Sequence, residues 1–137
     1  MKRIIIFAAL IFATMTSCNI EDDDSQNFFF EIVPIQSVEV PEEFIHGETY
    51  EISVSYNRPN DCYEFNDFIY GIDDNERTVA VVNTVYTNIE CNEVPELITV
   101  NFDLVVVSTE TYVFKFYQGS DGQGQDQYLL VEVPVVE

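Results

Sequence analysis

The sequence predicts an all-β protein, folded as a single antiparallel sandwich of about seven strands in two sheets. From Phe28 onward, apolar and polar residues alternate with a period of two, which is the pattern of half-buried strands. Turn-forming residues separate these stretches at the spacing found in sandwiches. No stretch has the period of a helix. Two facing antiparallel sheets bury one face of every such strand.

The first strands are predicted on either side of Pro34. Residues 28–33 alternate before it, and the alternation resumes after it until Pro41. Proline has no N–H to donate to a ladder and is therefore found at sheet edges. The segment is expected to be an edge strand that passes from one sheet to the other.

The clearest strand is predicted over residues 50–57, and the turn residues 58–61 end it. Residues 62–72 form the next strand, rich in Tyr and Phe, and the turn at 73–76 joins it to a hairpin partner over 78–86. In the clearest strand the residues expected to face the core are Tyr50, Ile52, Val54 and Tyr56.

Three further strands are predicted over 97–104, 111–117 and 128–133. A loop over 88–96 and a flexible turn over 119–126 accompany them. The side chains expected to face the core are Ile98, Val100, Phe102, Leu104, Tyr112, Phe114, Phe116, Leu129, Val131 and Val133.

Residues 1–17 have the features of a signal peptide. Lys2 and Arg3 precede ten apolar residues, 4–13, a run too short to span a bilayer as a helix. Residues 15–18 (MTSC) follow and resemble the lipobox of bacterial lipoproteins, where small residues precede an invariant cysteine. The resemblance implies cleavage before Cys18, its acylation, and a lipid anchor in the membrane. The alternative is an ordinary secretory signal.

The stretch 18–27 is predicted to be the lipidated cysteine and a disordered acidic tether, because it has no apolar periodicity. The acidic run 21–24 resembles the export signal of surface lipoproteins of the Bacteroidota. That resemblance implies an outer-membrane location with the domain, residues 28–137, facing the extracellular side. The alternative interpretation of the run is a solvated spacer.

The mature chain is strongly acidic. After residue 17 it keeps three basic residues, Arg58, Arg77 and Lys115, against 25 acidic ones, a formal charge of −22. Phosphate backbones repel such a surface, so nucleic acid is excluded as a partner. Anionic headgroups repel it too, so the predicted membrane attachment depends on the lipid itself.

Three cysteines are present. With Cys18 as the lipid carrier, Cys62 and Cys91 remain, and in an exported protein they are expected to form a disulfide. The alternative, a redox or metal pair, lacks a CxxC spacing. The count therefore agrees with the lipobox.

Residues 108–116 (STETYVFKF) resemble the start of the F strand of immunoglobulin-like domains. In those domains a corner tyrosine bonds back to upstream backbone, two residues before a core position. The resemblance implies that Tyr112 is this tyrosine and Phe114 the core position. The family's inter-sheet disulfide has no counterpart here, and the chain has no tryptophan.

The sequence contains no catalytic constellation. His46, the single histidine, lies in a predicted loop over residues 41–47 without a nucleophile nearby, and no glycine-rich phosphate loop follows a strand. Two oxygen-rich turns are weak candidates for a calcium ion, which takes six to eight oxygen ligands. The alternative is ordinary polar hairpin turns. The candidate ligands are Asp73, Asp74, Glu76, Asp121 and Asp126.

These observations predict a non-enzymatic binding or interaction module with no cofactor. Its partner is expected to be a protein or a glycan. Tyr63, Tyr70 and Tyr117 are the candidates for outward positions, where they could stack on a sugar or anchor a protein. The alternative, which the sequence favours, is that they pack against neighbouring strands. The alternatives are a calcium-dependent adhesion or glycan-binding domain, and a hydrolase that uses paired carboxylates.

Overall fold

The structure is a computed structural model that describes residues 27–137, and this part of the chain is all-β, as predicted. The strands are β1 (Phe28–Val33), β2 (Ile35–Glu39), β3 (Phe44–Ile45), β4 (Thr49–Arg58), β5 (Tyr63–Asp73), β6 (Glu76–Tyr86), β7 (Glu96–Val105), β8 (Tyr112–Ser120), β9 (Asp126–Val133) and β10 (Val135–Val136).

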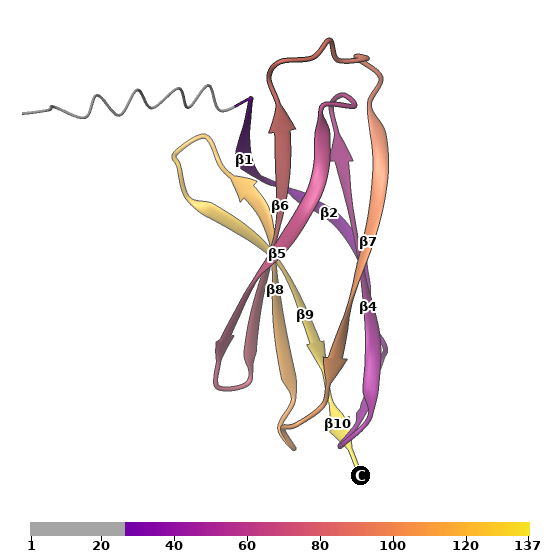
Figure 1. Cartoon of the computed structure of the whole chain (residues 1–137). Coiled ribbons are helices and arrows are strands. Elements are labelled where there is room, and N and C mark those ends of the chain that lie inside the picture. The colour runs from indigo at the N-terminus through magenta and orange to yellow at the C-terminus, as the bar shows by residue number, and fades with distance from the viewer. Residues whose placement is uncertain (1–26) are drawn as a thin grey trace, which may run out of the picture.

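Two main sheets form a sandwich-like fold (Figure 1). The five-stranded sheet has β5 on one edge of β6, while β1 and β8 share the other edge and β9 lies outside β8. The second sheet has the order β2-β4-β7, and the short β3 and β10 pair with each other. Figure 1 shows β4 and β7 along one side of the molecule and β6, β8 and β9 along the other.

The prediction of a wholly antiparallel sandwich is wrong in two places, because β6 pairs with β8 and β3 pairs with β10 in parallel. The first case follows from the placement of the β5–β6 hairpin. Its two strands run in opposite directions, and β6 is the one next to β8. A hairpin placed with β5 next to β8 would have given an antiparallel pair. Periodicity specifies faces and not strand direction.

The predicted change of sheet at Pro34 is confirmed. β1 pairs with β6 in one sheet and β2 pairs with β4 in the other. Gly119 of β8 passes close by, and a Cβ there would lie 3.2 Å from the Pro34 ring. The φ of Gly119 is 92°, so both the close approach to Pro34 and the left-handed backbone conformation favour glycine.

The core lies between the sheets, and the side chains predicted to be inward in β4, β7, β8 and β9 are all buried or packed against it. One central residue was not predicted. Phe44, expected in a loop, is fully buried on β3, with its ring centroid 4.9 Å from Tyr50, 5.4 Å from Tyr112 and 6.1 Å from Phe114. Complete burial of a side chain this size contributes about 1.5–3 kcal/mol.

Tyr112 bonds back to upstream backbone, as its position predicted. The side chain is fully buried, and its hydroxyl accepts hydrogen bonds from the main-chain N–H groups of Val107 (3.0 Å) and Ser108 (3.1 Å). These two groups end the segment that leaves β7. The hydroxyl therefore fixes the path by which the chain crosses from one sheet to the other.

We expect Tyr112→Phe to lower the free energy of unfolding by about 1–3 kcal/mol, because the two N–H groups lose their shared acceptor. Urea unfolding followed by circular dichroism measures the change. Tyr117→Phe is the control, since its hydroxyl makes one long contact with Ser120 (3.4 Å) near the surface. Equal stability of Tyr112→Phe and the wild type would contradict this role.

The predicted disulfide between Cys62 and Cys91 is present, with Cα atoms 5.4 Å apart. It attaches the start of β5 to the loop that joins β6 to β7. Asp61 and Asn92 add two hydrogen bonds, from the Asn92 N–H to the Asp61 carboxylate (2.7 Å) and from the Asp61 N–H to the Asn92 carbonyl (3.3 Å).

Residues 1–26 lie outside the described part of the chain. The predicted signal peptide, Cys18 and the acidic tether as far as residue 26 therefore remain predictions. Asn27, the last residue of the predicted tether, is described, and its carbonyl accepts a hydrogen bond from the Thr87 N–H (2.8 Å). Among the residues that are described, no helix is long and apolar enough to cross a membrane.

Candidate functional site

The larger candidate site is an open groove of about 400 Å³ between β5 and β7, which we call the flank groove. Phe68, Tyr70 and Ile72 of β5 line one wall, and Phe102, Leu104 and Val105 of β7 line the other. β5 is an edge of the five-stranded sheet and β7 an edge of the three-stranded one. The groove is thus the side of the sandwich where neither sheet has a further strand.

Aromatic rings join the two walls. The Phe102 ring centroid lies 5.1 Å from that of Phe68 and 5.7 Å from that of Tyr70, both in edge-to-face geometry. This geometry is the favourable one for aromatic pairs and holds the two edge strands at a fixed separation. The groove is therefore preformed.

The outward position of Tyr63 is wrong, because Tyr63 lies opposite Val85 and packs against the core. Tyr70 lies opposite the buried Val79 and lines the flank groove, where it stays 38% exposed, so both tyrosines are on the inward face of β5. The reason is a β-bulge between Phe65 and Asp67. A bulge inserts one residue, so the inward positions change from odd to even numbers within the strand.

Arg77 lines the flank groove at its end next to the β5–β6 turn and is only 4% exposed. Its Nη1 donates to the main-chain carbonyls of Asp74 (2.7 Å) and Glu76 (3.0 Å), and its guanidinium lies 4.9 Å from the Tyr112 ring centroid. Within residues 27–137, the ion pair observed is Arg58–Glu96. Carbonyl dipoles and a ring therefore compensate the buried charge of Arg77.

Burial also raises the pKa of Tyr70 above its ordinary value, although Arg77 nearby opposes the shift. The phenol is therefore neutral at physiological pH and keeps its hydrogen-bond donor. Asp67 and Asp103 add carboxylates to the lining of the groove. Since four of the 25 acidic residues precede residue 27, residues 27–137 carry 21 against three basic ones, a formal charge of −18.

A second, smaller cavity of about 300 Å³ lies on the outer face of the five-stranded sheet. We call it the fork cleft, because it forms where β1 and β8 share one edge of β6. Ile32 of β1, Thr78 of β6, Tyr117 of β8, and Asp126 and Tyr128 of β9 line it. The predicted outward position of Tyr117 is thus confirmed. The two tyrosine ring centroids are 5.9 Å apart.

The weak calcium candidates lie in two separate hairpin turns. Asp73, Asp74 and Glu76 belong to the β5–β6 turn, and Asp121 and Asp126 to the β8–β9 turn. The Asp121 carboxylate accepts hydrogen bonds from the Gln123 and Gln125 N–H groups (2.8 and 3.0 Å), and Asp126 accepts one from Ser120 (3.2 Å). In residues 27–137, no group of three or more His, Cys, Asp or Glu is placed to hold a metal ion.

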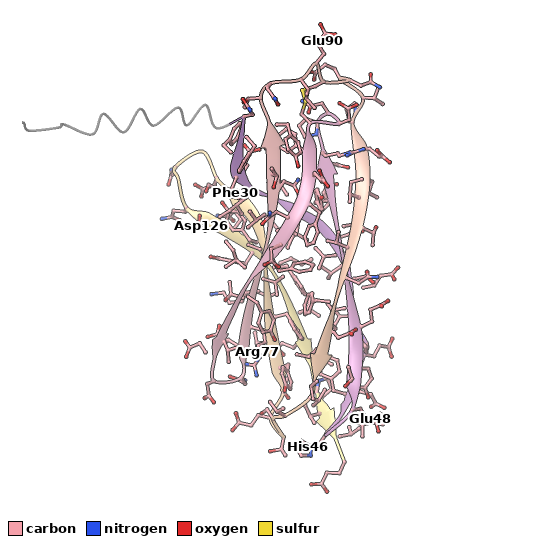
Figure 2. All side chains as sticks on the ribbon, in the orientation of Figure 1. Phe30, His46, Glu48, Arg77, Glu90 and Asp126 are labelled. Carbon is pink, nitrogen blue, oxygen red and sulfur yellow. A yellow bond between two sulfur atoms is a disulfide. The ribbon has the colours of Figure 1, made fainter. Side chains whose placement is uncertain are left out.

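His46 lies at the end of the molecule away from the β6–β7 loop that carries Glu90 (Figure 2). It is exposed, and its Nε2 atom is 3.3 Å from the main-chain carbonyl of Val107. This contact involves no nucleophile. The structure places His46 at the exposed end of β3, outside the linings of both cavities.

The flank groove itself was not predicted. The strands that supply its aromatic residues were predicted, but periodicity does not tell which strands form the edges of a sheet. One feature of the sequence could have indicated the groove. β7 is a long alternating stretch without lysine or internal proline, and such a stretch is unusual for a protected sheet edge. Comparison with known proteins found no family model, no curated protein and no solved structure that matches this chain.

Proposed function

We propose that this chain is a lipid-anchored lipoprotein of the cell envelope that acts as a non-enzymatic binding module. The flank groove is the observation that carries the proposal. It is apolar, preformed and within the size range of ligand sites, with a few polar groups at its ends. An open groove between two sheet edges suits the binding of a protein segment.

The anchor and location are part of the same proposal. The lipobox resemblance assigns the lipid to Cys18, and the acidic run behind it favours the extracellular side of the outer membrane. The Cys62–Cys91 disulfide supports export, because such bonds persist in oxidising compartments. Cys18 is then the one cysteine left for acylation.

An immunoglobulin-like relationship is also proposed. The Tyr112 hydroxyl and its two main-chain donors support it. The parallel pairing of β6 with β8 departs from it. The relationship therefore rests on the corner between β7 and β8 and on the two-sheet architecture.

A matched pair of variants tests the groove. Val105 and Leu130 are both exposed apolar residues on strands, at 53% and 62%, but only Val105 lines the groove. After formaldehyde crosslinking of intact producing cells, we expect wild type and Leu130→Lys to give one discrete larger species. Val105→Lys should reduce it by about tenfold, the effect of losing roughly 1.4 kcal/mol of binding. An equal yield from the two variants would contradict the proposal.

A second candidate function is glycan binding at the fork cleft. Tyr117 and Tyr128 offer ring faces, while Thr78 and Asp126 offer a hydroxyl and a carboxylate beside them. Ring faces next to hydrogen-bonding groups are suited to sugars. An oligosaccharide whose affinity falls on Tyr117→Ala and is unchanged by Val105→Lys would favour this function.

A further inference from the structure

The free edge of β7 has two acidic side chains, Glu96 and Asp103, but lacks the other devices that normally protect a sheet edge. Its ten residues pair with β4 in one continuous register, without a bulge, a lysine or a proline. In contrast, β5 has a bulge after Phe65, and β2 follows Pro34 and has a register shift of its own. A long, regular and partly apolar edge is a template for another strand.

The main-chain groups that face this free edge can be identified. Val106 donates to the Glu48 carbonyl and accepts from the Gly47 N–H, both at 2.9 Å, so its polar groups point toward the β4 side. In an antiparallel pair, successive residues point alternately toward the partner and away from it. Asn101, Asp103 and Val105 therefore present their N–H and C=O groups to the free edge. The next such group along the chain, the Val107 N–H, is not free, because it already donates to the Tyr112 hydroxyl.

We propose that the β7 edge accepts an added β-strand from a partner protein, in which apolar residues alternate with basic ones. The proposal rests on the proposed function of the flank groove and names its ligand. Apolar side chains of the added strand enter the groove between Tyr70 and Phe102. Basic side chains lie on the outer face of the three-stranded sheet, beside Asp103, whose carboxylate also borders the groove.

Charge selects this partner over a second copy of the chain. Residues 27–137 carry a formal charge of −18, and β7 itself contributes Asp103, while its Glu96 is paired with Arg58. Two such edges repel each other, whereas a basic strand is attracted. Directly opposed opposite charges on neighbouring strands also stabilise a sheet.

The test uses a synthetic peptide of four Val-Lys repeats and a control peptide with the same residues in two blocks. Amide hydrogen exchange of the whole domain, residues 27–137, is followed by NMR. With the alternating peptide we expect exchange at Asn101, Asp103 and Val105 to slow by about tenfold or more, because these amides become hydrogen-bonded. The amides of Leu104 and Val106 should stay unchanged, and the block peptide should protect none.

Two variants test whether the main-chain groups of the β7 edge hold the peptide. Val105→Pro removes an edge N–H without removing a bond to β4, so it should abolish protection at Asn101 and Asp103. Should this variant lose the ladder to β4, seen as fast exchange at Val106, Val105→Lys replaces it. That variant keeps the N–H and repels a basic peptide, while Leu130→Lys serves as its control.

Three outcomes overturn the proposal. A peptide that binds without protecting the edge amides binds through charge alone. Equal protection by the block peptide removes the requirement for alternation. A dimer of the peptide-free protein that Val105→Pro dissociates assigns the edge to a second copy. In each case the proposed function survives if Val105→Lys still removes the crosslinked species in cells, and it fails if that species persists.

Discussion

Phe44→Ala is expected to lower the free energy of unfolding by about 3–5 kcal/mol, the usual cost of removing a buried phenylalanine. Its ring lies in edge-to-face contact with Tyr112 and Phe114 of β8, in the five-stranded sheet. Removal leaves a cavity lined by rigid rings that cannot collapse into it. For a domain with a total stability of about 5–15 kcal/mol, this is a large fraction.

The same substitution is expected to loosen the C-terminus, because alanine keeps the main-chain bonds of β3 but lacks the buried ring that holds β3 against the core. The Phe44 N–H donates to the Pro134 carbonyl (2.9 Å), and β3 holds β10 in a two-residue parallel pair. Urea unfolding gives the change in stability, and hydrogen exchange at Val136 reports on the end of the chain. Ile45→Ala is the control, because the neighbouring side chain is 46% exposed. A loss below about 1 kcal/mol for Phe44→Ala would contradict its central place in the core.

The second large effect is expected from Cys62→Ala combined with Cys91→Ala. The disulfide closes a loop with a sequence separation of 29 residues, which is worth about 3 kcal/mol in the chain-entropy model. For a domain of this size the melting temperature should fall by about 10 °C. The β6–β7 loop should also loosen, because the bond attaches it to the start of β5.

Thermal unfolding of the double variant, and of the wild type with and without reductant, measures this effect. The reduced wild type and the double variant should melt together. Cys62 is fully buried and Cys91 is only partly buried, so Cys91→Ala alone isolates the crosslink from the packing. A double variant as stable as the oxidised wild type would show that the folded loop needs no crosslink.

Periodicity predicted the strands that have one buried face and a regular register. β4 alternates along its length and β8 as far as Tyr117, before its register shift, and their inward residues are the ones found in the core. It failed in β5, where the bulge after Phe65 changes the inward positions, and at β3, where two residues are too short for a period. Strand direction was not predictable, since parallel and antiparallel partners present the same alternation.

Predicting the candidate sites from the sequence would have required knowing which strands lie next to each other in the sheets. The flank groove exists because β5 and β7 are edges, and the fork cleft because β1 and β8 meet on the same edge of β6. Neither fact is local in the sequence. The disulfide and the Tyr112 hydroxyl were predictable, because cysteine pairing and the corner tyrosine depend on residue identity at fixed positions.

The proposed location of the groove on the cell depends on the proposed lipid at Cys18, and mass spectrometry tests it. The chain is extracted from the membranes of cells that produce it, and its N-terminal peptide is analysed by mass spectrometry. We expect a peptide that begins at Cys18 and carries the mass of two or more acyl chains, which is the number needed for stable anchoring. A peptide that contains Ser17, or a free thiol at Cys18, would contradict the proposed anchor.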